Sequence, residues 1–322
     1  MDPFAGLPPR ERALLRRAPL PDRVELMKAV LTDERFSDPA WIFERKLDGI
    51  RCLAIKGRGN VRLVSRNDLS LNRRYPELVE ALRRDAADGF AVDGEVVAFD
   101  RRGRTSFARL TRRGRGRVAV FLYVFDLLHL AGHDLTALPQ RARKALLRRA
   151  LSFHGPVRFT PHRNRDGERL YREACRRGWE GLIAKRADAP YVHARSRDWL
   201  KLKCQAAQEL VIGGWTAPRG SREELGALLL GHWRDGSFVY AGKVGTGFDA
   251  ATLRDLARRL SPLRREDSPF HAGDPPTRDT TWVDPELVAQ IAFTEWTRDG
   301  RLRHPRFLGL REDKPAREVV RE

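Results

Sequence analysis

The eight residues Glu44–Arg51, with the sequence ERKLDGIR, constrain this chain more than any other stretch. The apolar run Trp41–Phe43 opens a strand just before Lys46, and Asp48-Gly49 is a turn signal. We therefore expect a strand that holds Lys46 immediately before a sharp turn. Taken alone, the stretch is equally compatible with a solvated lysine–aspartate pair. If Lys46 is a nucleophile, desolvation, a metal ion or neighbouring cations must offset its ordinary pKa of about 10.4.

Strands dominate the part of the chain that follows. The glycine-rich segment 57–60 separates two short runs of strand character and indicates a hairpin. Phe90–Phe99 is predicted to be a buried strand with an acidic interruption, and Val118–Leu128 a long strand rich in aromatic residues. Apolar residues with helical spacing occur between such strands. The expected helices are Glu11–Arg17, Tyr75–Ala86, Pro139–Leu151 and Gly167–Gly178, and the further strands are Arg51–Lys56, Val61–Ser65, Gly181–Lys185 and Trp199–Lys203.

The pattern changes near residue 205. Short strands joined by glycine-rich or charged turns follow, with one amphipathic helix among them. About five short strands and one helix fit a small barrel of the oligonucleotide-binding (OB) kind. A length of 322 residues also suggests two domains, which we place at 1–204 and 205–322. The second domain is expected to contain strands at Leu210–Trp215, Gly226–Trp233, Phe238–Val244 and Leu287–Thr297, a helix at Ala250–Leu260 and a loop at 264–280.

The balance of charges points to a polyanionic partner. The chain has 62 lysine and arginine residues against 43 acidic ones, a net charge of +19. Such an excess favours nucleic-acid binding, although a generic basic surface gives the same count. No apolar stretch is long enough to cross a bilayer, so we expect no membrane association. The cysteines, Cys52, Cys175 and Cys204, lack CxxC spacing, and we expect neither a zinc site nor a disulfide framework, and a reducing, cytoplasmic location.

Lysine is used sparingly. Only nine of the 62 basic residues are lysines, and three of these, Lys28, Lys56 and Lys144, lie outside any motif-like segment. Because lysine is a compact charge that can lose its proton, its retention inside such segments suggests chemistry that arginine cannot perform. The six lysines in motif-like segments are Lys46, Lys185, Lys201, Lys203, Lys243 and Lys314.

Six further segments follow Lys46 in a fixed order. Asp93-Gly94-Glu95 interrupts an apolar strand, and Lys201 and Lys203 alternate along another, which directs both side chains to one face. Each segment alone has an ordinary structural explanation, such as an edge charge or a solvated face, but their combination is not plausibly chance. The six are Ser65–Asn67, Asp93–Glu95, Phe125–Asp126, Glu180–Lys185, Trp199–Lys203 and Arg311–Lys314.

This ordered set resembles the ATP-dependent DNA ligases of the covalent nucleotidyltransferase superfamily. The likeness covers nearly the whole chain and points to the ligase module of bacterial end-joining DNA ligases, through segments such as EGLIAKR at 180–186, SRDWLKLK at 196–203 and AGKVGTGF at 241–248. It implies an α+β fold, with an adenylation (nucleotidyltransferase) domain of ATP-grasp-like antiparallel sheets and helices at 1–204 and an OB-fold β-barrel at 205–322. It also implies sealing of 5′-phosphate/3′-hydroxyl nicks through lysyl-AMP.

The resemblance implies a role for each candidate residue. Lys46 would attack the α-phosphate of ATP, and Lys201 and Lys203 would stabilise the charge that develops there. Glu44 would accept a hydrogen bond from the adenine amino group, and Phe125 would stack on the purine. The other residues that the resemblance places at the nucleotide are Arg51, Arg66, Glu95, Glu180, Lys185, Arg311 and Lys314.

Among these, Arg51 and Arg66 would hold ribose and phosphate oxygens through their forked donors. Glu95 and Glu180 would contact ribose hydroxyls or a divalent ion, Mg²⁺ or Mn²⁺, that bridges phosphate oxygens, and which of them does which is open. Lys185 would complete the nucleotide contacts from the end of the segment that begins at Glu180.

Arg311 and Lys314 would orient pyrophosphate from the OB domain during the adenylation step only. The expected partners are nicked duplex DNA and an end-binding protein such as Ku. The protein is expected to act as a monomer in the bacterial cytoplasm, at the nucleoid. Its initial Met1 favours a stand-alone ligase over an excised module.

Three other functions remain open from the sequence. An RNA-capping guanylyltransferase shares the lysine motif and the two-domain plan, and labelled ATP or GTP would separate the two. An RNA ligase would also adenylate itself, so nicked RNA must be compared with nicked DNA. A basic OB-fold nucleic-acid-binding protein without activity would have no need of an intact Lys46, Glu95 and Glu180.

Overall fold

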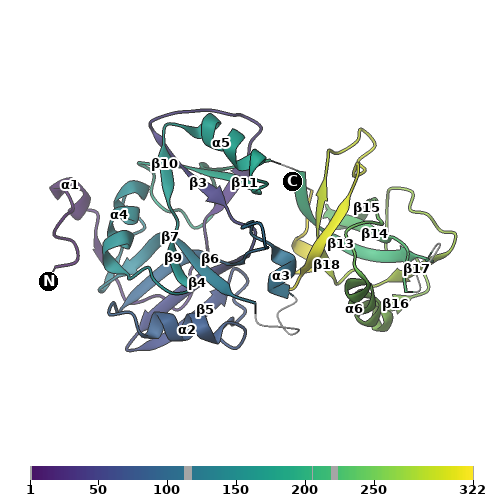
Figure 1. Ribbon diagram of the computed structural model, residues 1–322, viewed down its shortest axis with the longest axis horizontal. Coiled ribbons are helices and arrows are strands. Elements are labelled where there is room, and N and C mark those ends of the chain that lie inside the picture. Colours follow the sequence, from purple (N-terminus) through teal and green to yellow (C-terminus); the bar gives the residue numbers. More distant parts are fainter. Residues whose placement is uncertain (1, 112–117, 205, 219–223, 322) are drawn as a thin grey trace. The chain divides into compact units, whose positions relative to one another are not determined.

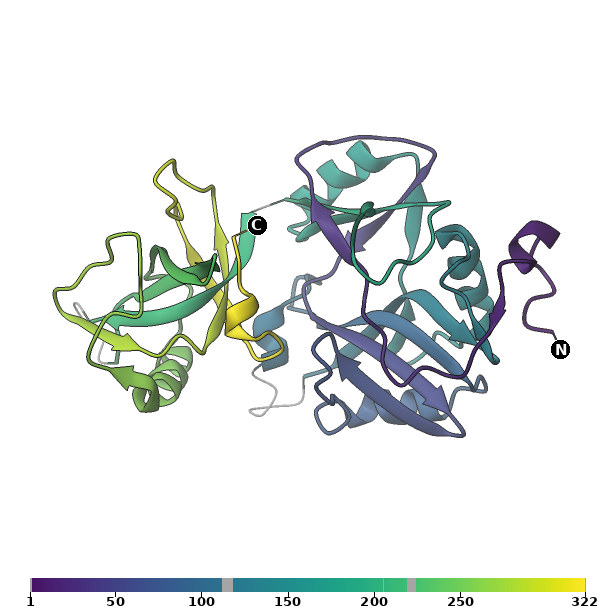
Figure 2. The same ribbon diagram turned by 180° about the vertical axis from the view of Figure 1, so that it is seen from behind.

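The computed structural model describes residues 2–111, 118–204, 206–218 and 224–321 (Figure 1). The chain divides into two compact units, Met1–Cys204 and Gln205–Glu322. Each unit has its own sheets, which Figure 2 shows from behind, and its own apolar core. The secondary structure is a mixture of mainly antiparallel sheets and a few helices, as expected of an α+β protein. Within the described ranges, no helix is long and apolar enough to cross a membrane.

The first sheet of unit 1 has the strand order β1-β8-β7-β6-β4-β5, and β9 pairs with β7. All of these pairs are antiparallel except β7 with β9. The expected hairpin joins β4 to β5, and Arg58 and Gly59 at its turn have positive φ angles. The strands are β1 (Arg16–Arg17), β4 (Ile50–Gly57), β5 (Asn60–Ser65), β6 (Phe90–Ala98), β7 (Val120–Leu130), β8 (His133–Asp134) and β9 (Val157–Phe159).

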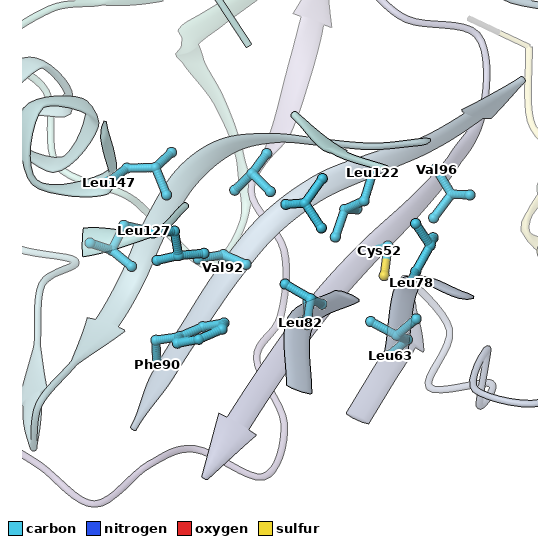
Figure 3. Packing of buried hydrophobic residues seen from close by; sticks show 14 of the residues in the cluster. Cys52, Leu63, Leu78, Leu82, Phe90, Val92, Val96, Leu122, Leu127 and Leu147 are labelled. Atoms are coloured by element: carbon cyan, nitrogen blue, oxygen red, sulfur yellow. The ribbon is translucent and has the colours of Figure 1, made fainter. Parts of the chain in front are cut away.

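Two helices cover one face of this sheet, α2 (Pro76–Arg83) and α4 (Gln140–Ala150). Pro76 at the first helical position starts α2, because its missing N–H would have no partner there in any case. Leu78 and Leu82 of α2 and Leu147 of α4 are buried against the strands (Figure 3). The strand residues that pack with them include Cys52, Leu63, Phe90, Val92, Val96, Leu122 and Leu127.

The second sheet of unit 1 has the order β10-β3-β11-β12-β2 and is antiparallel except for β12 with β2. The helix α5 (Gly167–Arg176) covers one face, where Leu170 and Ala174 pack with Phe43 and Leu182. Since side chains alternate along a strand, the other face carries Glu44 and the residues in step with it. The strands are β2 (Lys28–Leu31), β3 (Trp41–Lys46), β10 (His162–Asn164), β11 (Gly181–Arg186) and β12 (Arg195–Lys203).

A separate apolar cluster joins the uncovered faces of the two sheets. Leu53 and Phe125 enter it from the first sheet, and Trp199 enters it from β12 of the second. Met27 and Tyr191, which lie just before β2 and β12, complete the contact. The charged candidate residues therefore lie around an apolar cluster that holds the two sheets together. The remaining helices of unit 1 are α1 (Pro9–Arg12) and α3 (Phe107–Thr111).

Unit 2 is built around β13 (Ala206–Thr216), which pairs with β14, β17 and β18. The helix α6 (Ala250–Leu260) begins at Asp249, whose side chain accepts a backbone hydrogen bond, and buries Leu256 and Leu260 in the core. The other elements are β14 (Leu228–Arg234), β15 (Ser237–Val244), β16 (Arg264–Arg265), β17 (Thr280–Val283), β18 (Val288–Phe293), β19 (Arg306–Arg311) and the 3₁₀ turns Ser261–Leu263 and Ala316–Glu318.

Most expected elements are present, and the exceptions have local causes. The helix expected at Glu11–Arg17 is wrong: α1 ends at Arg12, and Arg16–Arg17 instead pair with β8. The loop expected at 264–280 begins with a short strand that pairs with β17. The strand Arg306–Arg311 was not expected. Its single glycine and flanking charges obscure the alternation of buried and exposed side chains, which becomes apparent from its pairing with β18.

The expectation that the cysteines form no disulfide is also wrong. Cys175 and Cys204 are joined by a disulfide, and Cys52 is a free, buried thiol. The two bonded cysteines are 29 residues apart, a separation that matches no short motif. They come together because α5 lies beside the end of β12, where the hydroxyl of Tyr171 in α5 donates to the carbonyl oxygen of Lys203 (2.9 Å).

Reduction of this disulfide should destabilise unit 1. A crosslink that closes a loop of this length typically contributes about 2–4 kcal/mol by restricting the unfolded chain. In denaturant unfolding, a dithiol reductant should lower the stability of the wild-type protein and leave Cys175→Ser unaffected. Thiol titration of the unfolded, unreduced protein should find one free thiol. Three free thiols, with no effect of the reductant, would contradict the disulfide.

Candidate active site

The Asp48-Gly49 turn places Lys46 at the end of β3. The backbone N–H of Asp48 donates to Thr105 Oγ1 (3.1 Å), and its Oδ2 accepts from the backbone N–H of Phe107 in α3 (3.2 Å). Gly49 admits no side chain, because a Cβ there would overlap a carbonyl oxygen of β6. Asp48 and Gly49 therefore end β3 at Lys46 and turn the chain into β4.

Lys46 is held by Glu180. Its Nζ lies 2.5 Å from Oε1, and the two side chains are 19% and 18% exposed. Burial lowers the pKa of Lys46, but Glu180, Glu95 and Asp48 outweigh burial and raise it above its usual value. Desolvation, a metal ion or neighbouring cations would favour the neutral amine, but these carboxylates have the opposite effect. The ammonium group must therefore lose a proton before Lys46 can act as a nucleophile.

Lys201 and Lys203 lie on β12, two residues apart, and so face the same side as expected. Lys203 is in register with Gly181 of β11, which is in register on its other side with Lys46 of β3. Lys46 and Lys203 are thus two strand spacings apart, about 10 Å between backbones. Gly181 has a φ of +150°, and a Cβ there would overlap the carbonyl oxygen of Leu202, so only glycine fits between the two lysines.

Glu44 lies on the same face of β3 as Lys46 but is only 2% exposed. Its Oε1 accepts a hydrogen bond from Lys144 Nζ, and its Oε2 lies 2.9 Å from Lys185 Nζ. Burial raises the pKa of Glu44, but the two ammonium groups outweigh burial, so the net pKa is lowered. Burial also lowers the pKa of Lys185 to about 8, against the attraction of Glu44. The carboxylate is therefore ionised at neutral pH.

Cations flank the ring of Phe125 on β7. The Arg51 guanidinium lies 4.7 Å and the Lys185 ammonium 4.3 Å from the ring centroid. Arg51 donates to both carboxylate oxygens of Asp93 (2.5 and 2.6 Å) and to the carbonyl oxygen of Met27 (3.2 Å). Burial lowers the pKa of Arg51, but Asp93 outweighs it and raises the pKa. These donors contact the protein itself, and a contact of Arg51 with a nucleotide stays a prediction.

A buried network supports Phe125 from the next residue. Asp126 accepts two hydrogen bonds from Arg143 of α4 (2.7 and 3.0 Å), and both side chains are completely buried. Arg143 also donates to Gln140 Oε1 (3.0 Å), which accepts a second bond from the indole N–H of Trp199 (3.1 Å). The network thereby links β7, α4 and β12. It fixes Phe125 and Trp199 relative to each other, with ring centroids 6.0 Å apart.

Arg66 and Glu95 lie on the first sheet and its margin. Arg66 follows β5 in a turn in which Ser65 Oγ accepts two backbone N–H groups. Its Nη2 is buried and meets no acceptor in the described part of the chain. Glu95 on β6 is in register with Arg51, and its charge contributes to the raised pKa of Lys46. Both placements are compatible with contacts to a nucleotide, which stay predictions.

Some of the buried polar atoms without a hydrogen bond belong to candidate residues. Within the described ranges they include Arg66 Nη2, Glu180 Oε2 and Lys185 Nζ. Lys185 Nζ has its ion pair with Glu44, whereas Arg66 Nη2 and Glu180 Oε2 are a donor and an acceptor that a bound nucleotide could meet, since buried polar groups normally have partners. The same ranges contain no group of three or more metal-ligating side chains. A magnesium ion held by Glu95 and Glu180 would therefore share its remaining ligands with phosphate oxygens and water.

In unit 2 the structure brings Arg311 and Lys314 together around Glu209. Arg311, at the end of β19, donates two hydrogen bonds to Asp313 (2.9 and 2.8 Å), and its Nη1 lies 4.0 Å from Glu209 Oε1. Lys314 Nζ lies 3.2 Å from Glu209 Oε2. Two adjacent cations held by two carboxylates fit a group that binds a phosphate chain. Their contact with pyrophosphate stays a prediction.

Two family models match the chain. The model described as ATP dependent DNA ligase domain matches residues 21–203, and that described as ATP dependent DNA ligase C terminal region matches residues 221–314. The chain belongs to the ATP-dependent DNA ligase family. This ligase chain is 39% identical over 329 residues to the multifunctional non-homologous end joining protein LigD of Pseudomonas aeruginosa, with 99% of the chain and 39% of the relative covered.

Other relatives agree. The LigD protein of Mycobacterium tuberculosis is 41% identical over 291 residues, which cover 88% of the ligase chain and 37% of the relative. The chain thus spans about two fifths of the length of these curated relatives. A solved mycobacterial DNA ligase D complexed with ATP and MES is 36% identical, with a TM-score of 0.70 and coverage of 93% of this chain and 98% of that one. These matches confirm the expected nucleotidyltransferase and OB-fold plan.

Sequence reasoning missed Lys144, Arg143 and Tyr191. Lys144 and Arg143 lie in the helix expected at Pro139–Leu151, outside any motif-like segment. The signal lay in the spacing: Gln140, Arg143, Lys144 and Leu147 share one face of α4, and that face is buried. Tyr191 donates to Asp93 Oδ2 and accepts from the Met27 N–H (both 2.8 Å). No local sequence pattern of the ligase chain predicts these contacts.

Replacing Asp126 by asparagine should destabilise unit 1 of the ligase chain. The isosteric amide leaves the buried Arg143 charge uncompensated, and breaking a buried ion pair costs about 3–5 kcal/mol. Asp166→Asn is the matched control, because Asp166 pairs with Arg169 on the surface, where such pairs contribute about 0–1 kcal/mol. Equal unfolding free energies of the two variants, measured with denaturant, would show that the buried network does not stabilise the site.

Proposed function

We propose that this chain seals 5′-phosphate/3′-hydroxyl nicks in duplex DNA with ATP, as the ligase part of bacterial end joining or of nick repair. The observation that supports this most is the arrangement on one face of the second sheet of unit 1. Lys46 and Glu180 are paired at its partly open end, Lys203 lies two strands away, and Glu44 is buried further along β3. This arrangement provides a nucleophile, cations for phosphate and a carboxylate for a base.

In the first step, Glu180 Oε1 is the nearest acceptor for the proton that the Lys46 ammonium must lose. The lone pair of the amine then attacks the α-phosphorus of ATP. The new N–P bond forms as the bond to pyrophosphate breaks, and lysyl-AMP and pyrophosphate result. Lys201 and Lys203 face the same side and stabilise the charge on the reacting phosphate. A bound divalent ion would add further neutralisation of the phosphate oxygens.

The later steps use the same phosphorus chemistry. An oxygen of the 5′-phosphate at the nick attacks the phosphorus of lysyl-AMP, the N–P bond breaks, and the Lys46 amine is released and reprotonated. The 3′-hydroxyl then gives up its proton and attacks the activated 5′-phosphorus. A phosphodiester bond forms and AMP leaves. Lys46 is therefore needed for its own adenylation but not as the nucleophile that closes the nick.

The two units differ in charge. Residues 1–204 contain 44 lysines and arginines against 25 acidic residues, whereas residues 205–322 contain 18 of each. All of the excess positive charge therefore lies in unit 1, and long-range attraction toward DNA phosphates comes from there. Unit 2 instead supplies local contacts, such as the exposed Lys243 of β15.

We further propose that the protein acts as a monomer at the bacterial nucleoid, in the cytoplasm, together with an end-binding protein such as Ku. The end-joining role rests on the relatives' names, which describe non-homologous end joining proteins of bacteria, whereas the monomer, the nucleoid and Ku come from the sequence resemblance. In ligation assays with purified proteins, Ku should increase the joining of duplex ends and leave the sealing of a pre-formed nick unchanged.

Lys46→Arg should abolish self-adenylation. A guanidinium keeps the positive charge but does not lose a proton under these conditions, so it cannot attack phosphorus. With ATP labelled at the α-phosphate, the wild-type protein should retain label after denaturation, and the variant should retain none. Lys28→Arg, on the edge strand β2 of the same sheet, is the control and should label normally. Covalent labelling of Lys46→Arg would mean that another residue is the nucleophile.

Affinity for nicked duplex DNA should fall steeply with salt, with a log–log slope of about −0.9 per phosphate neutralised. Removal of the exposed pair Arg172 and Arg176 on α5 should weaken binding more than removal of Arg254 and Arg258 on α6, since only unit 1 has excess positive charge. Both double alanine variants remove two charges. Equal losses of affinity, or a response that is flat in salt, would argue against attraction by the charge of unit 1.

A further inference from the structure

Lys144 lies outside every motif of the sequence, yet it is one of the most buried side chains of unit 1, with 2% exposure. From α4 its Nζ donates to Glu44 Oε1 and to the carbonyl oxygen of Thr160 (3.0 Å), and it lies 4.7 Å from the ring centroid of Phe159. A buried ammonium is costly unless it is paired, so its position is set by Glu44 and Thr160. Its ion pair is therefore with one oxygen of the Glu44 carboxylate, Oε1.

Lys185 approaches the same carboxylate from the other side. Its Nζ lies 2.9 Å from Glu44 Oε2 and is packed against the rings of Phe125 and Trp199, at 4.3 and 4.1 Å. Within the described ranges this Nζ makes its ion pair but no hydrogen bond of good geometry. Glu44 Oε2 and Lys185 Nζ therefore present an acceptor and a donor side by side, next to an aromatic ring.

This pair lies at the closed end of the face that carries Lys46. Glu44 is almost fully buried, whereas the Lys46 and Glu180 side chains are each nearly one-fifth exposed. The two positions are two residues apart on β3, about 7 Å between Cα atoms. A nucleotide whose α-phosphate meets Lys46 would therefore direct its base along β3 toward Glu44, Lys185 and Phe125.

We propose that Lys144 is a positioning residue that sets the choice of nucleobase. By holding Oε1 it fixes the Glu44 carboxylate, so that Oε2 stays an acceptor and the Lys185 ammonium beside it stays a donor. Adenine has an amino donor at C6 beside a ring acceptor at N1. Guanine has an acceptor at O6 beside a donor at N1, which is the opposite order. If Glu44 and Lys185 are fixed, they can bind only the donor–acceptor order of adenine. A Glu44 carboxylate that is free to rotate could bind either base.

This inference rests on the proposed self-adenylation, and its test is a single-turnover assay of covalent nucleotide transfer with ATP and with GTP. In Lys144→Met the half-saturating ATP concentration should rise about tenfold or more, because a hydrogen bond to a charged group is worth about 1.5–3 kcal/mol and a factor of ten is about 1.4 kcal/mol. The maximal rate should stay within about twofold, since Lys46 and Glu180 are untouched. The preference for ATP over GTP should fall by at least tenfold.

Two comparisons separate this role from a merely structural one. Lys56→Met is the matched control, because Lys56 is also a buried lysine of unit 1, 4% exposed, and donates only to the carbonyl oxygens of Arg83 and Asp85. It should lower stability without changing the ATP preference. Purine riboside triphosphate lacks the 6-amino group, so its half-saturating concentration should respond to Lys144→Met much less than that of ATP.

A third comparison covers the case in which Lys144→Met does not fold well. Glu44→Gln should itself reduce the ATP preference, and adding Lys144→Met to it should reduce the preference no further, because Lys144 acts only through Glu44. An unchanged preference in folded Lys144→Met would overturn the proposal, as would fully additive losses in the double variant. A wild-type protein that forms no covalent nucleotide at all would instead overturn the proposed function.

Discussion

The ion pair between Arg51 and Asp93 is the contact on which the arrangement of unit 1 depends. Both residues belong to the first sheet, but Asp93 also accepts from the hydroxyl of Tyr191, which in turn accepts from the backbone N–H of Met27. Met27 and Tyr191 lead into β2 and β12 of the second sheet. One buried carboxylate thus connects the two sheets. The candidate site exists only where these sheets meet, so its geometry depends on this connection.

The same contact limits what Arg51 can do. Its Nε and Nη2 donate to Asp93 and Met27, and its guanidinium lies 4.7 and 5.6 Å from the ring centroids of Phe125 and Trp199. A nucleotide that took those donors would have to break the link between the sheets. Arg66, by contrast, has a buried Nη2 without an acceptor in the described part of the chain. Arg66 Nη2 is therefore a donor that a phosphate or ribose oxygen can use without breaking a contact in the described part of the chain.

Many elements of the fold were predictable because they follow from local patterns. The hairpin at 57–60, the helix α6 and the alternation of Lys201 and Lys203 each depend on a few neighbouring residues. The partners of Glu44 were not predictable in this way. Lys144 is one hundred residues away along the chain, on a helix whose many arginines conceal a buried face. The Cys175–Cys204 disulfide has the same origin, since it depends on where α5 ends in space.

Long-range pairing also explains why some buried cations are lysines and others arginines. Arg51 and Arg143 each meet a buried aspartate whose two oxygens take two parallel donors of the guanidinium fork. Lys56 meets two carbonyl oxygens, and Lys144 meets one carboxylate oxygen and one carbonyl oxygen. An arginine at those two positions would bury further N–H groups without acceptors. The scarce lysines of this chain are therefore informative in two ways, because they occur both where a proton must be lost and where only a compact charge can be satisfied.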